Sequence, residues 1–461
     1  MCRKQKIPKW SYPSGGRLEA DKNSEVRSMS TREAENKDGA DLLGRVLARE
    51  NFNRAYKQVK EKKGAAGIDG MTVNGLLEYL HEHKESFLES LRNESYQPQP
   101  VKRVEIPKPD GGVRLLGIPT VRDRMIQQAI AQVLIPIYEA EFSEHSYGFR
   151  PNRNAHQAVR QACEYYDQGY CWVVDIDLSK YFDTINHELL MEMLRERITD
   201  QRVLNLIKGF LKSGVMVNGV VAKTEEGSPQ GGNLSPLLSN IYLTVFDREL
   251  ERRGHKFVRY ADDINIYVKS RRAADRVLQN SRKFLETKLK LKVNESKSKT
   301  GSPIELKFLG LALRSNPRGT RVRIHEKSKE RFKDKIRELL RRNQGKAIGV
   351  VLTILQRYTT GWLGYFAIAD MKEFIRHCNE WIRRKIRVYM WNQWKSTRCQ
   401  AENLRRLGIH REKAWMWANT RKGCWRIADS QVLNWSLTNQ RIVEMGYDDI
   451  LVRYNKLHSN Q

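Results

Sequence analysis

The sequence predicts an α+β protein with an antiparallel sheet in its middle and an all-helical last third. Phe257–Val268 (FVRYADDINIYV) alternates like a β-hairpin around two adjacent acids, and the β-rich run Trp172–Val174 leads directly into further acids. From His325 onward the apolar residues recur at helical spacing. A chain of 461 residues is long enough for two or three domains with cores of their own.

Composition indicates a polyanionic partner. The formal net charge is +29, and the part from Asn316 onward holds 31 Lys and Arg against 13 Asp and Glu, which accounts for +18 of that total. An excess of this size predicts binding by counterion release, with strong salt dependence. We therefore expect the downstream part to be the main electrostatic footprint.

Cysteine usage and hydropathy favour a soluble, cytoplasmic protein. The six cysteines show no CxxC spacing and no paired histidines, so neither a zinc site nor a disulfide framework is indicated, and thiols in a reducing compartment are expected. No apolar run reaches membrane-spanning length, and the N-terminus lacks the apolar region of a signal peptide.

The elements upstream of the acids begin with a polar lead-in. Residues 1–40 predict a disordered or weakly ordered segment, with an RNA-binding arm as the alternative. Leu42–Glu61 predicts a helix, followed by the basic, Gly-rich KKGAAGIDGMT, which is either a template contact or a flexible connector. Val101–Pro119 predicts a hairpin with Lys108 and Arg114 flanking its DGG turn, and Arg122–Tyr138 a helix.

The acids are the candidate site. Asp262 and Asp263 at a tight turn repel each other, which raises the pKa of at least one of them unless a cation lies nearby. Asp175 and Asp177 follow a strand that can lie beside this hairpin, and Lys180–Leu190 then has helical spacing. Such a set suits two Mg²⁺ ions about 3.5–4 Å apart in nucleotidyl transfer. For the Asp-Asp dipeptide alone, a solvated turn is the simpler interpretation.

Three motifs in this order resemble reverse transcriptases. DLSKYFD at Asp177–Asp183 looks like motif A, GSPQGGNLSPLLSNIYL at Gly227–Leu243 like motif B, and YADD at Tyr260–Asp263 like motif C. With RVEIPKPDGGVRLLGIPTVRDR before them and RYTTGWLGYF after them, the chain from about Leu42 onward is similar to bacterial group II intron-encoded reverse transcriptase/maturases. Some members continue into a His-Asn-His endonuclease domain, of which this sequence shows no block.

The resemblance implies right-hand polymerase fingers and palm, with an antiparallel palm sheet, followed by an all-α thumb/maturase (X) domain. It divides the chain into a lead-in (1–40), N-terminal extension and fingers (41–170), palm (171–315), thumb/X domain (316–400) and a basic, DNA-binding C-terminal segment (401–461). Within the X domain the sequence predicts helices at His325–Arg342, Ile348–Ala369 and Met371–Lys395. Leu306–Leu313 is expected to be a strand of the primer grip.

The resemblance also implies roles for single residues. The catalytic acids and ligands of two Mg²⁺ ions, with Mn²⁺ as an alternative, would be Asp177, Asp262 and Asp263, whereas Asp183 is structural. The dNTP would be held by Lys108 and Arg114, discriminated from rNTP by Phe182, and paired beside Gln230. Phe182 as core and Lys108 and Arg114 as exposed edge cations are the alternatives. Either Lys297 or Lys299 is a candidate general acid.

Nucleic-acid contacts are expected at six basic residues. They lie in the YGFRPNR loop and in the third X-domain helix: Arg150, Arg153, Arg383, Arg384, Lys385 and Arg387.

The predicted function is an RNA-directed DNA polymerase that also binds its group II intron RNA to assist splicing and retrohoming. Its partners are the intron RNA, an RNA template with a DNA primer or target DNA, and dNTPs. The alternatives are a stand-alone defence or retron-type reverse transcriptase, and a maturase that binds RNA for splicing only. The RYTTGWLGYF block disfavours the first alternative, and the intact acids disfavour the second.

Overall fold

A computed structural model describes residues 41–107, 111–217, 220–222, 226–228 and 231–459. The chain forms two compact units. We call residues 1–158 with 172–300 the N-terminal unit, and residues 159–171 with 301–461 the C-terminal unit. Helix α6 (Ala155–Asp167) and strand β8 (Lys299–Gly301) lie at the boundaries between them.

The fingers side of the N-terminal unit is built on one buried helix. Helix α5 (Val121–Glu139) begins at Thr120, whose hydroxyl accepts a hydrogen bond from the Asp123 amide, and it is buried over most of its length. Helices α2 (Leu42–Leu47) and α3 (Arg49–Lys62) pack against it. This region also contains α4 (Gly75–Arg92), α7 (His187–Arg195) and α8 (Gln201–Lys212). Its four-stranded sheet has the order β2-β1-β4-β5, from Val113–Ile118, Val101–Pro107, Val215–Val217 and Val220–Ala222.

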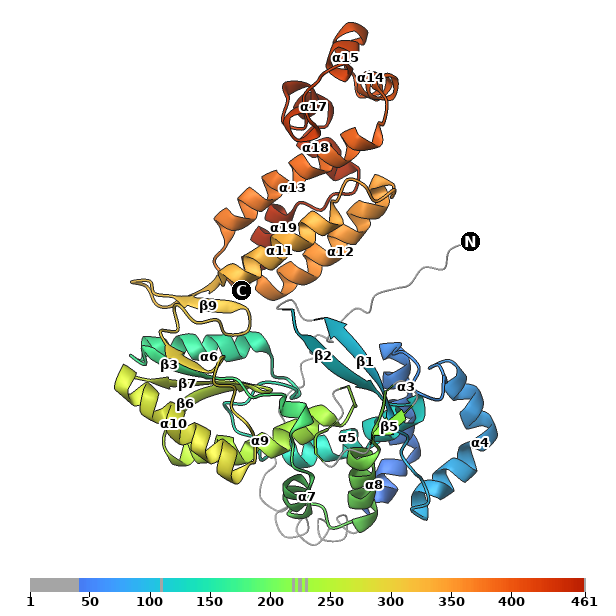
Figure 1. Ribbon diagram of the computed structural model, residues 1–461, viewed down its shortest axis with the longest axis vertical. Coiled ribbons are helices and arrows are strands. Elements are labelled where there is room, and N and C mark those ends of the chain that lie inside the picture. The colour runs from blue at the N-terminus through green and yellow to red at the C-terminus, as the bar shows by residue number, and fades with distance from the viewer. Residues whose placement is uncertain (1–40, 108–110, 218–219, 223–225, 229–230, 460–461) are drawn as a thin grey trace, which may run out of the picture. The chain divides into compact units, whose positions relative to one another are not determined.

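A second sheet holds the acids. Its order is β6-β7-β3-β8, and β6 (Lys256–Tyr260), β7 (Asp263–Val268) and β3 (Trp172–Ile176) pair antiparallel. Helices α9 (Ser235–Arg252) and α10 (Arg271–Lys288) lie along one face of it (Figure 1). Every residue of β7 after Asp263 is buried, because the strand is central in the sheet.

The C-terminal unit has one core that runs from its first strands to its last helix. Strands β9 (Leu311–Arg314) and β10 (Arg321–Ile324) form a hairpin, which is followed by α11 (Glu326–Leu339), α12 (Ile348–Phe366) and α13 (Lys372–Gln393). Helix α19 (Ile450–His458) returns to pack on α12 and α13. The short helices between them are α14 (Thr397–Arg406), α15 (Arg411–Ala418), α16 (Cys424–Ile427), α17 (Gln431–Ser436) and α18 (Asn439–Glu444). The division predicted after residue 400 therefore does not separate two cores.

Sequence periodicity located most elements, and three predicted spans differ from the structure. The predicted Leu42–Glu61 helix is broken at Ala48, whose ψ is 135°. The predicted Lys180–Leu190 helix is instead a single 3-10 turn, η1 (Tyr181–Asp183), followed by the start of α7. The Asn186 side chain caps the N-terminus of α7. The predicted Leu306–Leu313 strand begins only at Leu311, because a tight turn precedes it.

Candidate active site

Strand pairing brings Asp177 and Asp262 together. Ile176 at the end of β3 lies opposite Ile264 on β7, so Asp177, the next residue, reaches the turn between β6 and β7. That turn has only two residues between the paired Tyr260 and Asp263. Two carboxylates from segments far apart in the sequence thus meet at one edge of the sheet, as predicted.

Burial and nearby charges both act on the pKa of the Asp262 carboxyl. Burial raises it above the ordinary value, and its own backbone amide lowers it. The charge of Asp177 raises it further, while Arg114 and Arg259 lower it. Arg114 is exposed on β2 and lies opposite Ile106. Its positive charge therefore acts on Asp262 from the fingers sheet.

Asp263 lies differently from its neighbour. It opens β7, is exposed, and pairs through its backbone with Tyr260. Across the described ranges of the chain, no three His, Cys, Asp or Glu side chains converge closely enough to hold a metal ion by themselves. The structure therefore assembles the predicted acids as a pair, and the role of Asp263 remains a prediction.

The pair fits a divalent metal nonetheless. Hard carboxylate oxygens are what Mg²⁺ prefers, and it is bound through one or two carboxylates together with substrate phosphates more often than by an all-protein cage. Burial first, and then the charge of Asp177, raise the pKa of Asp262, and a cation bound between the two carboxylates would favour their charged forms.

The backbone of Asp177 is fixed by the segment that carries the candidate lysines Lys297 and Lys299. Its amide donates to the Ser298 hydroxyl at 3.0 Å, and its carbonyl accepts from the Asn294 amide at 2.8 Å. Lys297 and Lys299 flank Ser298, and both are exposed. The choice of a general acid between them stays open.

Motif B residues tie the acids to the fingers. The Ser228 amide donates to the Phe182 carbonyl at 2.7 Å, so the loop after β5 lies against η1. A Cβ on Gly231 would come within 2.5 Å of the Gly117 carbonyl on β2, a close approach that only glycine permits. The Asn233 backbone amide donates to Gln127 Oε1 on α5 at 2.9 Å, and its side-chain Nδ2 donates to the Arg124 carbonyl and to Gln128 Oε1. Sequence reasoning missed these contacts, although the paired glycines signalled a close approach.

Two predicted dNTP contacts, Lys108 and Gln230, lie outside the described residues. The third and fourth are described. Phe182 is half-buried, with its ring 5.2 Å from that of Tyr181, and Arg114 is exposed. A half-buried ring has room both to pack in the core and to meet a ligand.

Arg150 is not available to a phosphate, which corrects one predicted contact. Its side chain is 2% exposed, and its guanidinium donates to the Glu139 carboxylate and to the carbonyls of Ser143 and Ser146. Arg153 pairs with Glu144 but keeps about a quarter of its side chain exposed. Arg150 is thus an internal cross-link, whereas Arg153 stays a candidate.

The predicted basic cluster on α13 is also mostly internal. Arg383 donates to Asp449 at 2.7 Å, and the buried Arg387 donates to the Leu437 carbonyl at 2.9 Å. Arg384 donates to the Trp425 carbonyl, 41 residues away, and its guanidinium lies 4.1 Å from the centre of that ring. Lys385 lies over the Trp381 ring, and burial lowers its pKa. Arg383, Arg384 and Arg387 thus hold the last helices of the unit on α13, and RNA contact by the predicted cluster remains a prediction.

Unpaired cations gather elsewhere in the C-terminal unit. A surface depression lined by residues 420–426 and Arg342 presents four exposed cations and no carboxylate: Arg342, Arg421, Lys422 and Arg426. Lys422 lies over the Trp417 ring, and Trp425 on the same rim is 43% exposed. Among the described residues, no acid pairs with any of the four. We call this feature the basic depression.

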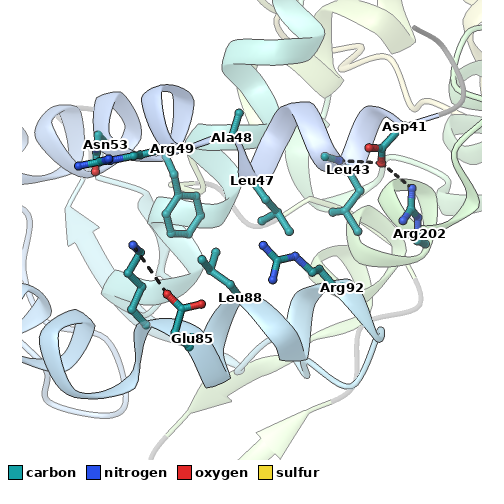
Figure 2. A pocket seen from close by; sticks show the side chains of 13 residues that line it. Asp41, Leu43, Leu47, Ala48, Arg49, Asn53, Glu85, Leu88, Arg92 and Arg202 are labelled. Atoms are coloured by element: carbon teal, nitrogen blue, oxygen red, sulfur yellow. Dashed lines mark hydrogen bonds and ion pairs between the residues drawn. The ribbon is translucent and has the colours of Figure 1, made fainter. Parts of the chain in front are cut away.

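A second cavity, of about 510 Å³, contrasts with it. Residues of α2, α3 and α4 line it, and it is drawn in Figure 2. Apolar Leu47 and Leu88 line it, and Asp41 pairs with Arg202 at its edge at 2.9 Å. Because its rim includes acids that pair with its cations, it is less suited to a polyanion than the basic depression.

One carboxylate lies at the end of a strand, and the other lies in the turn of a neighbouring hairpin. A glycine-rich loop ties this pair to a basic fingers hairpin. This arrangement defines the palm of a nucleic-acid polymerase. A family model for reverse transcriptases (RNA-dependent DNA polymerases) matches residues 106–313. A model for the group II intron maturase-specific domain matches residues 329–408. The chain belongs to the group II intron-encoded reverse transcriptase/maturase family.

Curated relatives agree with this membership. Protein YkfC of Escherichia coli (strain K12) is 36% identical over 298 residues, which cover 56% of this chain and 78% of that protein. Group II intron-encoded protein LtrA of Lactococcus lactis subsp. cremoris is 32% identical over 334 residues, which cover 58% of this chain and 55% of LtrA. The match therefore spans only about half of the length of LtrA.

Among solved structures, a chain of the "Partial Cas6-RT-Cas1--Cas2 complex" is 26% identical, with a TM-score of 0.35 over 52% of this chain and 42% of that one. We draw no conclusion from a likeness at that TM-score. In the described part of the chain, no helix is long and apolar enough to cross a bilayer.

Proposed function

We propose that the chain copies RNA into DNA at the Asp177–Asp262 pair and binds a group II intron RNA through its C-terminal unit, assisting splicing and retrohoming. The observation that carries the catalytic part is the convergence of the two carboxylates, which follows from the pairing of β3 and β6 with β7 and from the charge of Asp177 acting on Asp262. A reverse transcriptase domain implies dependence on a divalent metal. Mg²⁺ as that metal, and two ions as their number, are part of the proposal.

The residues of this chain divide the work. Asp177 and Asp262 would hold the metal, which when bound lowers the pKa of the primer 3′-hydroxyl and neutralises charge on the triphosphate. Arg114 adds a fixed positive charge beside the acids, where the triphosphate carries its negative charge. Phe182 offers its half-buried ring to the sugar. The test is extension of a DNA primer on an RNA template: extension that requires added Mg²⁺ supports the proposal, and no extension with any template contradicts it.

Phe182→Ala is expected to admit ribonucleotides. The truncation removes the ring that would crowd a ribose 2′-hydroxyl, and one such steric contact corresponds to roughly 10- to 200-fold in discrimination. Steady-state incorporation of dNTP and rNTP on one primer–template gives the ratio. An unchanged ratio in a folded protein would mean that Phe182 serves only to pack against the core, which it also contacts.

Intron RNA is proposed to bind at the basic depression, because no described acid pairs with its four cations, whereas Arg383 and Arg387 on α13 are hydrogen-bonded within the unit. An aromatic ring beside phosphate-binding cations suits RNA with splayed bases. The maturase-specific match at residues 329–408 supports RNA as the partner, since Arg342 lies within it.

Arg421→Glu with Lys422→Glu is expected to flatten the salt dependence of intron RNA binding by about 0.7 to 1 unit of log–log slope for each lost phosphate contact. The control is Lys372→Glu with Lys456→Glu, which makes the same change in net charge at exposed cations outside the depression. RNA titrations across a salt series measure both variants. Equal slopes for the two variants would mean that the depression is no more than part of a diffuse positive surface.

A further inference from the structure

The turn that carries Asp262 has an unfavourable backbone conformation. Ala261 has φ +57°, a region that a non-glycine residue rarely occupies, and its side chain is buried. Such a conformation persists where the surroundings hold it. The residue beside the carboxylate is therefore under an external constraint.

Part of that constraint is a buried guanidinium. Arg259 on β6 is fully buried and donates through Nε to both carboxylate oxygens of Asp247, at 2.8 and 2.9 Å. Its Nη1 donates to Asn240 Oδ1 at 2.9 Å and to the Ala261 carbonyl at 3.1 Å. Asp247 and Asn240 are also fully buried and lie seven residues apart on α9, hence on one face of that helix. Arg259 thus links α9 to the peptide group that precedes Asp262.

The other part comes from the loop before α6. A Cβ on Gly148 would lie 2.2 Å from the Ala261 amide nitrogen, so the loop backbone rests directly on the turn. Asn240 Nδ2 donates to the Gly148 carbonyl at 2.9 Å. The Arg259 amide donates to the His145 carbonyl at 2.9 Å, and the Tyr147 amide donates to the Arg259 carbonyl at 2.8 Å. The loop therefore runs beside β6 and ends against the turn.

We propose that Gly148, Asn240, Asp247 and Arg259 form a clamp that positions Asp262 for metal binding. This rests on the proposed catalytic function. None of the four is proposed to touch substrate, so they are positioning residues that act through the conformation of the Ala261–Asp262 turn. Arg150 supports the clamp indirectly, because its hydrogen bonds to the Ser143 and Ser146 carbonyls fix the loop that carries Gly148.

The decisive variant is Gly148→Ala, whose added methyl forces the turn and the loop apart. The matched control is Gly75→Ala in the same unit, where the nearest atoms to the new methyl are 3.8 Å away. We expect Gly148→Ala to lower kcat for single-nucleotide incorporation at least tenfold while KM for dNTP and the dissociation constant for primer–template stay within twofold. Gly75→Ala is expected to match the wild type.

The affinity of the protein–primer–template complex for Mn²⁺ gives a readout that needs no turnover. It is measured from the loss of the free Mn²⁺ signal in electron paramagnetic resonance. The clamp predicts at least tenfold weaker binding in Gly148→Ala. Wild-type Mn²⁺ affinity and wild-type kcat in a folded Gly148→Ala protein would overturn it. If the wild type binds Mn²⁺ but incorporates nothing, the polymerase proposal fails, and Mn²⁺ affinity still decides the clamp.

Asn240→Asp is a second test of the clamp, for use if the Gly148→Ala protein does not fold. It keeps the acceptor for Arg259 and removes the donor to the Gly148 carbonyl, with almost no change in volume. The clamp predicts the same pattern, with weaker Mn²⁺ binding and lower kcat at unchanged primer–template affinity. Equal loss of primer–template binding and kcat would instead make Asn240 an ordinary core residue and contradict the proposal.

Discussion

Asp262→Asn is expected to lower single-nucleotide incorporation by about a thousand-fold or more, because a lost ligand charge forfeits several kcal/mol of transition-state stabilisation and each 1.36 kcal/mol is tenfold in rate. RNA affinity should stay unchanged, since the substitution leaves every cation in place. Single-turnover incorporation and RNA titration on the same preparation measure the two quantities.

The control for this variant is Asp183→Asn. Asp183 belongs to motif A together with Asp177, is exposed on η1, and is not proposed to hold the metal. It should incorporate at close to the wild-type rate. An Asp262→Asn protein that extends primers normally would refute the assignment of the metal site, and an equal loss in both variants would place the effect in the local fold.

Arg387→Glu is expected to unfold much of the C-terminal unit at temperatures where the wild type is stable. The side chain is 7% exposed and donates to the Leu437 carbonyl and to Asn439 Oδ1, so a carboxylate there would face two acceptors with no donor. An uncompensated buried charge costs about 3–5 kcal/mol. At about 2–4 °C for each kcal/mol in a domain of this size, the melting temperature should fall by roughly 6–20 °C.

Circular dichroism melts check this, with Arg405→Glu as the control, since Arg405 is exposed on α14 of the same unit. The control should melt within a few degrees of the wild type. If Arg387→Glu melts normally but loses RNA affinity, Arg387 is a surface contact after all, and the internal role derived from its hydrogen bonds would be wrong.

Local patterns predicted the centre of the molecule well. The alternation in Phe257–Val268 is a short-range signal, and the hairpin formed where it was expected. The meeting of Asp177 with Asp262 also followed, because a buried strand ending in an acid has few places to lie other than beside that hairpin. Helices after His325 were confirmed for the same reason, since their apolar stripes are periodic.

The roles of the arginines were not predictable in the same way. The sequence around a basic residue on a helix is the same whether its side chain is exposed to solvent or paired with an acid. Arg383, for example, pairs with Asp449, which is 66 residues away. Pairing over that span depends on how the last helices return to α13, and no local pattern contains this information. The sequence therefore could not show that these arginines are bonded within the unit.

One signal for the clamp was present and was not used. Arg259 stands between Val258 and Tyr260 in a strand of mostly apolar and aromatic residues, and a charge buried in such a strand requires an ionic partner. The identity of that partner, Asp247, follows only from the packing of α9 on β6. The strain at Ala261 is likewise a property of the folded turn.

The most direct test is to add dNTPs and Mg²⁺ to the purified protein with the RNA that co-purifies with it, and to sequence the DNA that forms. A polymerase bound to its own intron predicts DNA copies dominated by one structured group II intron, and none from the Asp262→Asn protein. DNA copied from a random transcript pool would contradict the intron-binding half of the account. No DNA at all, from a folded protein that retains RNA, would contradict the polymerase half.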